Sequence, residues 1–286
     1  MKLTSISLHG EPAYGIVENG RINIPDDSFR SQFVDLKAVL AGHAVAELTA
    51  APMTEQIPLG DAEFAPVIPI PGRILCVGIN FRAHMKEMGR EPPEHPWLFV
   101  RFADSQVGHG QPMIRPIESE EYDYEGELAV VMGRVAHRVK AADALNYVAG
   151  YTCFNDGSIR DFQRHSTQFT PGKNFYKSGS VGPWLVTADE IPDPSVLNLE
   201  TRLNSKIMQQ APISDLKFDV PYLIEYISQF CRLMPGDVIS TGTPGGVGAA
   251  RKPPVWLKPG DKIEVEIDGI GVLKNTVADS VIPIPR

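Results

Sequence analysis

Acidic residues alternate with other residues at the start of one apolar run, and this pattern limits the fold more than any other feature of the chain. Residues 122–133 read YDYEGELAVVMG. Successive side chains of a strand point to opposite faces, so this order places Asp123, Glu125 and Glu127 on one face. Residues two apart in a strand lie ~6.6 Å apart, and two carboxylates at that spacing repel by roughly 2.5 kcal/mol at an effective dielectric of about 20. The apolar residues that follow are typical of a strand covered on both faces, so we expect part of the acidic cluster at the rim of a buried sheet.

A carboxylate cluster at a buried rim needs a cation. Oxygen ligands without a neighbouring Cys or His favour a hard divalent ion, Mg²⁺, Mn²⁺ or Ca²⁺, over zinc. An edge strand whose acids face solvent fits the same residues, and this segment alone leaves both interpretations open.

Length and charge limit the class of protein. The 286 residues suffice for one large domain, or for a large domain with a small one. The 25 Gly and 25 Pro residues predict many turns and short strands. A net charge of -8, without a run of Lys or Arg, argues against nucleic acid or a membrane as partner and leaves room for a small anionic substrate.

The cysteines and the apolar runs bear on the compartment. Cys76, Cys153 and Cys231 are far apart and lack Cys-x-x-Cys spacing, which predicts reduced thiols. The first residues lack the apolar stretch of a signal peptide, and no later run approaches about eighteen apolar residues. We therefore expect a cytoplasmic protein without a membrane segment.

The beginning of the chain predicts a small α+β unit. Two strand-like segments flank Asn19-Gly20, the dipeptide best suited to a type I′ hairpin. A short helical stripe follows, and five prolines then punctuate residues 52–71. We expect a small N-terminal domain over 1–68 and a catalytic domain over 69–286.

A short helix is predicted after the apolar strand at 73–78. Asn80 can cap it and Gly89 can end it, which places His84 and Glu87 three residues apart on one face. A carboxylate that holds a histidine ring orients it and raises its basicity, as suits a general base that removes a proton from water. A helix this short is marginal alone, so we expect it to order over a bound ligand. A solvated His-Glu pair is the alternative.

Another apolar strand ends just before Asp156, which is either a third metal ligand or a turn residue. Ser158 with Asp161 resembles a capping box and predicts a short helix that carries Arg160 and Gln163 on one side.

Lys173 falls in a predicted loop over 170–175, where a lone lysine is usually solvated. The glycine-rich segment 240–248 lacks Gly-x-x-x-x-Gly-Lys and Gly-x-Gly-x-x-Gly, so it does not support a nucleotide site.

Four motifs occur in one order along the chain: Asp123-Tyr-Glu125-x-Glu127-Leu-Ala-Val-Val, Asn155-Asp156-x-Ser-x-Arg160-Asp-x-Gln163, Gly172-Lys173-Asn-Phe and Ser240-Thr-Gly-Thr243-Pro-Gly-Gly-Val-Gly. Together they resemble the fumarylacetoacetate hydrolase superfamily over roughly residues 70–280. The resemblance implies an α+β, mainly β fold: a mixed β-roll or sandwich catalytic domain with few helices and a small N-terminal α+β domain. It also implies a homodimer.

The resemblance assigns roles to particular residues. The implied metal ligands are Glu125, Glu127 and Asp156, with Mg²⁺ or Mn²⁺ as the usual ion and Ca²⁺ as a further option. The segment from Gly78 to Glu87 resembles a lid that carries a catalytic His84-Glu87 dyad. The resemblance also implies that further residues contact the substrate or stabilise negative charge, namely Arg160, Gln163, Lys173, Gly242 and Thr243.

These roles lead to an expected activity. A 2-oxo acid can chelate a metal that acts as a Lewis acid. Water activated by His84 would attack the distant carbonyl of a 2,4-dioxo acid, such as an acylpyruvate, fumarylpyruvate or fumarylacetoacetate from aromatic catabolism. The leaving carbanion spreads its charge as an enolate, which Lys173 helps to stabilise. The alternatives are oxaloacetate decarboxylation, isomerisation or hydration of an unsaturated 2-oxo dioate, and binding of a small acid without chemistry.

One departure from the family pattern affects the substrate. Many relatives carry Leu-Lys-Pro where this chain has Val100-Arg101-Phe102. We expect Arg101 to change the charge geometry near the mouth of the pocket, and residues 101–110 and 164–180 to shape the substrate.

Overall fold

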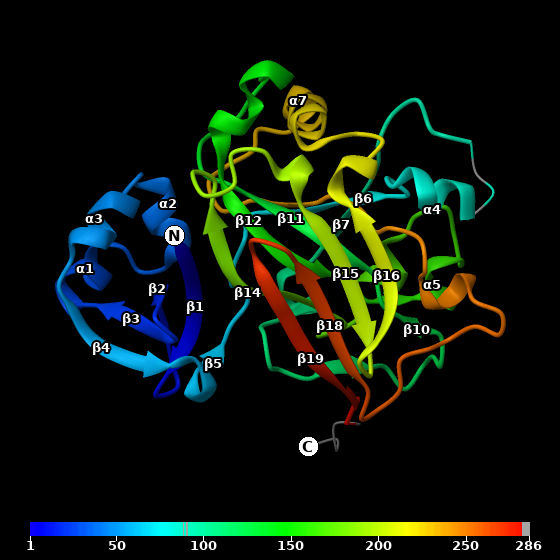
Figure 1. Cartoon of the computed structure of the whole chain (residues 1–286), viewed down its shortest axis with the longest axis horizontal. Coiled ribbons are helices and arrows are strands. Elements are labelled where there is room, and N and C mark those ends of the chain that lie inside the picture. Colours follow the sequence, from blue (N-terminus) through cyan, green and yellow to red (C-terminus); the bar gives the residue numbers. More distant parts are fainter. Residues whose placement is uncertain (88, 90, 282–286) are drawn as a thin grey trace.

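Two packed β-sheets position the rest of the chain (Figure 1). The computed structural model describes residues 1–87, 89 and 91–281. The strands are β1 (Lys2–Leu8), β2 (Glu11–Glu18), β3 (Arg21–Pro25), β4 (Met53–Pro58), β5 (Glu63–Phe64), β6 (Ile74–Gly78), β7 (Trp97–Arg101), β8 (Gln106–Val107), β9 (Met113–Arg115), β10 (Tyr122–Asp123), β11 (Gly126–Met132), β12 (Val148–Asn155), β13 (Ser158–Ile159), β14 (Gly179–Thr187), β15 (Asn198–Leu203), β16 (Lys206–Pro212), β17 (Val238–Ser240), β18 (Lys262–Ile267) and β19 (Gly271–Asp279).

The larger sheet is 12-stranded, in the order β4-β3-β2-β1-β14-β12-β11-β17-β6-β7, with β5 beside β1 and β8 beside β14. A 5-stranded sheet of order β16-β15-β18-β19-β9 packs over β11 and β12, and a 2-stranded sheet joins β10 to β13. The predicted fold class, α+β and mainly β with few helices, is confirmed.

The helices are short except for one. They are α1 (Asp27–Gln32), α2 (Leu36–Ala41), α3 (Val45–Ala50), α4 (Arg82–Glu87), α5 (Arg160–Gln163), α6 (Thr170–Lys173) and α7 (Val220–Phe230). Short 3-10 helices lie at Leu59–Asp61, Ala103–Ser105, Ala141–Tyr147, Pro194–Val196, Ile213–Asp215 and Gly248–Ala250. Asp219 caps α7 by accepting a hydrogen bond from the Tyr222 N–H, and the helix buries Leu223, Ile224 and Ile227.

The central strand β11 is covered on both faces, as the apolar run predicts. All seven of its residues are buried. Leu128 and Val130 pack in the core cluster that includes α7 and the 5-stranded sheet. Ala129 and Val131 point the other way, into a cluster that includes α2. The alternation of side chains along the strand therefore joins two hydrophobic cores through one sheet.

The N-terminal strands extend the larger sheet. Asn19 and Gly20 have φ angles of 51° and 74°, as a type I′ turn requires, and they connect β2 to β3. β1 pairs with β14 with Lys2 opposite Val186, so this part of the chain lies directly beside the larger part (Figure 1). The division into domains at residue 68 stays a prediction.

One local prediction needs correction. Ser158 lies in β13 and its hydroxyl donates to the Asp156 carbonyl, so it does not cap α5. The residue at the start of that helix is Ile159, which has no side-chain cap, and both Ser158 and Ile159 pair with β10.

The remaining expectations concern cysteines and membrane segments. All three cysteines are free thiols in the structure. Among the residues described, none of the helices combines the length and the apolar character that crossing a bilayer takes.

Candidate metal centre and active site

Three buried carboxylates converge where β11 begins and β12 ends. Glu125, Glu127 and Asp156 each offer an oxygen, and these oxygens lie within 4.8 Å of one another. β11 and β12 are antiparallel, with Gly126 opposite Asn155, so the start of one strand lies beside the end of the other. The Asp156 N–H donates to the Glu125 carbonyl at 2.8 Å, which fixes the two segments together.

Close packing between the two sheets explains why the residue between Glu125 and Glu127 is a glycine. A Cβ atom at Gly126 would lie 2.0 Å from Thr201 Oγ1 in β15. Only glycine therefore allows the second sheet to approach this closely. The approach buries the carboxylates on either side.

Asp123 does not join the cluster, contrary to the prediction that it shares a face with Glu125 and Glu127. The strand is interrupted after Asp123, because β10 pairs with β13 instead of continuing into β11. Asp123 accepts hydrogen bonds from Arg160 Nε at 2.8 Å and from the N–H groups of Gly248 and Ala249 at 2.7 and 3.0 Å. It therefore anchors the glycine-rich segment.

Lys173 is buried in α6, so the alternative interpretation, a solvated loop lysine, is wrong. Its Nζ lies 2.5 Å from Glu125 Oε2, 2.6 Å from Asp156 Oδ2 and 2.6 Å from Ser158 Oγ. Burial lowers the pKa of Lys173, but the negative charges of Asp156 and Glu125 outweigh it and leave the pKa raised. The group at this position is an ammonium ion.

The charges of Glu125 and Glu127 are balanced differently. Burial raises the pKa of Glu125, but Arg160 and Lys173 outweigh this effect and hold it well below its usual value. Glu127 Oε2 accepts from Ser240 Oγ at 2.5 Å and from the Gly242 N–H at 2.8 Å. Burial, reinforced by the charges of Asp156 and Glu125, raises the pKa of Glu127 well above its usual value.

A divalent cation fits this donor set. The three groups offer oxygen only, which matches the preference of a hard ion. Within the described part of the chain, no Lys or Arg pairs with Glu127, so its buried charge lacks the neutralising partner that a cation would supply. The identity of the ion stays a prediction.

His84 and Glu87 form a hydrogen-bonded pair. His84 Nδ1 lies 2.9 Å from Glu87 Oε2, and the Gly246 N–H donates to both Glu87 oxygens at 3.0 and 3.2 Å. His84 is 4% exposed, so the pair is not simply solvated. Burial raises the pKa of Glu87, but the His84 and Gly246 hydrogen bonds outweigh it and leave the pKa lowered.

One cavity of about 220 Å³ connects these groups. The predicted residues that line it are His84, Glu125, Glu127, Asp156, Arg160, Gln163, Lys173 and Thr243. The lining also contains apolar residues to which the sequence assigned no role, among them Val77, Phe99, Phe169 and Val247. Glu87 and Gly242 are not in the lining. Gly242 instead uses its N–H to hold Glu127.

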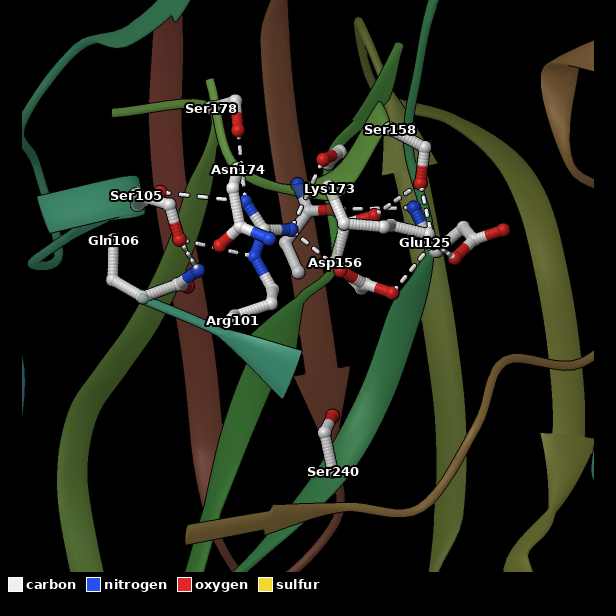
Figure 2. A network of polar contacts seen from close by, with 12 residues as sticks. Arg101, Ser105, Gln106, Glu125, Asp156, Ser158, Lys173, Asn174, Ser178 and Ser240 are labelled. Carbon is white, nitrogen blue, oxygen red and sulfur yellow. Dashed lines mark hydrogen bonds and ion pairs between the residues drawn. The ribbon is translucent and has the colours of Figure 1, made fainter. Parts of the chain in front are cut away.

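Arg160 and Arg101 complete the site. Arg160 Nη2 lies 2.6 Å from Glu125 Oε1, and its Nη1 donates to Gln163 at 2.9 Å. The side chain of Arg101 is fully buried behind Asp156, so its expected position near the mouth of the pocket is wrong. The sequence marks Arg101 as a departure from the lysine of many relatives, but only the fold shows which groups its guanidinium contacts. Figure 2 shows Asp156 between Arg101 and Lys173.

Comparison with known proteins gives matches over most of the chain. Residues 73–278 match the family model described as fumarylacetoacetate (FAA) hydrolase, C-terminal. Mitochondrial oxaloacetate tautomerase Fahd2a of Rattus norvegicus is 41% identical over 235 residues, which are 82% of this chain and 75% of that protein. Oxaloacetate tautomerase YisK of Bacillus subtilis is 42% identical over 224 residues, or 77% of this chain and 74% of that protein.

Solved structures match nearly end to end. A putative HpcE protein from Mycobacterium smegmatis superposes with a TM-score of 0.86 at 32% identity, over 98% of this chain and 100% of that chain. A fumarylacetoacetate hydrolase from Exiguobacterium antarcticum superposes with a TM-score of 0.85 at 33% identity, with the same coverage.

Proposed function

This chain belongs to the fumarylacetoacetate hydrolase family, and we propose that it is a divalent-metal-dependent enzyme that interconverts the keto and enol forms of a small 2-oxo dicarboxylic acid such as oxaloacetate. One observation carries the proposal. Three converging carboxylates, a buried ammonium and the ring of His84, which is hydrogen-bonded to Glu87, line a cavity of about 220 Å³.

The size of the cavity favours a small acid. Sites for drug-sized ligands occupy about 300–1,000 Å³, so a cavity of about 220 Å³ suits a four-carbon acid better than an aromatic or long-chain one. The relatives named oxaloacetate tautomerase, at 41% and 42% identity, support the same choice.

The residues present suggest how charge is managed. An ion held by Glu125, Glu127 and Asp156 would supply positive charge that polarises the 2-oxo group. Lys173 lies among the same carboxylates and can stabilise negative charge that develops on a substrate oxygen. Arg160 and Gln163 line the cavity and can orient a substrate carboxylate.

His84 is the group that moves the proton. The Glu87 carboxylate can only accept at Nδ1, which leaves Nε2 as the ring nitrogen that can exchange a proton with the substrate. In ketonisation the enol O–H loses a proton and C3 of the substrate gains one, while no bond between heavy atoms breaks. His84 Nε2 can accept a proton in one direction and return it in the other.

Hydrolysis of a 2,4-dioxo acid is the second candidate, and the His84-Glu87 pair favours it. The same Nε2 could remove a proton from water, which would attack the distant carbonyl. The bond between that carbonyl carbon and C3 would break, and C3 would leave as an enolate. The fumarylacetoacetate hydrolase from Exiguobacterium antarcticum supports this reading.

One set of assays tests the proposal. Purified protein with Mg²⁺ or Mn²⁺ is given enol-oxaloacetate, and the loss of the enol absorbance is followed beside pyruvate release and the cleavage of acetylpyruvate and fumarylpyruvate. Faster ketonisation than in buffer with the same metal supports the tautomerase. Turnover of acetylpyruvate or fumarylpyruvate alone supports the hydrolase. Release of pyruvate from oxaloacetate alone indicates a decarboxylase, and tight binding without turnover indicates a binding protein.

A further inference from the structure

Arg101 holds one side of Asp156 through a fully buried network. It lies at the end of β7, and its Nη1 is 2.5 Å from Asp156 Oδ1 and 3.0 Å from the Gly157 carbonyl. Nη2 donates to Ser178 Oγ at 2.8 Å, and Nε donates to Ser105 Oγ at 3.2 Å (Figure 2). Every nitrogen of the guanidinium is therefore used, and the fork is fixed in one orientation.

The other oxygen of Asp156 faces the cavity. Oδ2 lies 2.6 Å from the Nζ of Lys173, a residue of the cavity wall, whereas Arg101 is not in that wall. The two oxygens of Asp156 thus have different surroundings. Oδ1 is bound by Arg101 in the protein interior, and Oδ2 lies beside Lys173, on the side of the cavity.

The other two carboxylates follow the same rule. Glu125 Oε1 is held by Arg160 Nη2 at 2.6 Å. Glu127 Oε2 is held by Ser240 Oγ at 2.5 Å and by the Gly242 N–H at 2.8 Å. Each carboxylate therefore has one oxygen held by a group other than Lys173. The second oxygens of Glu125 and Asp156 both contact the Lys173 ammonium, so each carboxylate can turn at most one oxygen toward an ion.

We propose that Arg101 is a positioning residue that selects the metal, because it prevents Asp156 from binding an ion through both oxygens and so favours Mg²⁺ or Mn²⁺ over Ca²⁺. Ca²⁺ accepts bidentate carboxylates and six to eight oxygens at about 2.3–2.6 Å, whereas Mg²⁺ demands octahedral geometry at about 2.0–2.1 Å. The inference rests on the metal centre of the proposed function. It adds that Arg101, a residue that does not itself bind the ion, influences which ion binds.

An arginine suits this role better than a lysine. The planar guanidinium can contact Asp156 Oδ1 and Ser178 at once, and both contacts lie on fixed directions. A lysine ammonium is a point charge on a flexible stem, so it supplies the charge without holding one particular oxygen.

The test is a comparison of two metal affinities by titration calorimetry. Metal-stripped wild-type protein, R101M and R101K are each titrated with MgCl₂ and with CaCl₂. The ratio of the two Kd values is the readout, since loss of the Arg101 charge changes the affinity for both ions in the same direction. We expect the Kd for Ca²⁺ divided by the Kd for Mg²⁺ to fall about tenfold in R101M. This is the lower end of the effect of residues that support metal ligands. A smaller move in the same direction is expected in R101K.

Arg73 provides a matched control. Its Nη1 pairs with the buried carboxylate of Asp237 at 2.7 Å, and neither residue lines the cavity. R73M is expected to lower the Tm while leaving the Mg²⁺ to Ca²⁺ ratio unchanged.

The outcomes separate the two proposals. Wild-type protein that takes up neither Mg²⁺ nor Mn²⁺ would remove the metal centre itself. Wild-type uptake with the same ratio in R101M as in R73M overturns the role of Arg101 and leaves the proposed function standing. Should R101M fail to fold, R101K decides, and an unchanged ratio there overturns the inference as well.

Discussion

Glu87 holds His84 from one side and is itself held from the other. Its Oε2 lies 2.9 Å from His84 Nδ1, and both of its oxygens accept from the Gly246 N–H. Gly246 has a φ of 98° and belongs to the glycine-rich segment, which Asp123 anchors two residues further on through Gly248. The orientation of the candidate base therefore depends on a loop more than 150 residues away in the sequence, since Gly246 and Glu87 are 159 residues apart.

Removal of the histidine ring tests this pair directly. H84A is expected to lower kcat for the active substrate by about 100-fold or more, since a positioned general base contributes 10²–10⁴-fold. KM should change little. H137A, at an exposed histidine, is the control. Full activity in H84A would show that another group moves the proton.

The stability of the pair should depend on pH. The pKa of Glu87 is lowered in the folded protein, so its ionised form contributes stability that is present above the ordinary value of 4.5 and is lost as the pH falls through the lowered value. The Tm difference between wild type and E87Q is therefore expected to be constant above about pH 5.5 and to shrink as the pH falls below that. Thermal melts across this range check it, and a difference that grows in acid would contradict it.

Lys173 should matter for stability as well as for activity. K173M leaves Glu125 and Asp156 without a buried ammonium, and breaking a buried ion pair costs about 3–5 kcal/mol. We expect urea unfolding of metal-stripped K173M to show a loss of this size. Added Mg²⁺ should restore part of it, because the ion neutralises the same carboxylates. K206M, at an exposed lysine, is the control.

Chelation should reveal the metal in the wild-type protein. EDTA is expected to abolish turnover and to lower the Tm, and Mg²⁺ or Mn²⁺ should reverse both effects. An ion at about 100 times its Kd adds about 2.7 kcal/mol to the stability of the folded state. The double variant of Glu125 and Glu127 to Gln should show no response in Tm. An equal response there would place the ion elsewhere.

Phe169 is expected to limit the length of the substrate. It lines the cavity, packs edge-on against Phe99 with 5.7 Å between ring centroids, and lies 3.2 Å from where a Cβ of Gly78 would stand. F169A should raise kcat/KM for longer acylpyruvates relative to oxaloacetate by about tenfold, the scale of one or two methylenes in a pocket. A relative kcat/KM that does not change would mean that another part of the wall sets the length.

Much of the fold could be predicted from local pattern. The apolar run after Glu127 identifies a strand covered on both faces, and Asn19-Gly20 identifies a hairpin, because side-chain alternation and turn geometry depend only on near neighbours. The order of the motifs along the chain also identifies the family.

What the sequence alone determined is thus a set of polar groups: carboxylates at the rim of a buried strand and a His-Glu pair on a short helix. The tertiary structure alone decided that Lys173 is buried among those carboxylates, that Asp123 binds the glycine-rich segment instead of joining them, and that Arg101 contacts Asp156. These arrangements depend on the pairing of β11 with β12 and of β10 with β13. Contacts between segments far apart in the chain are set by sheet register and packing, which no local pattern of residues contains.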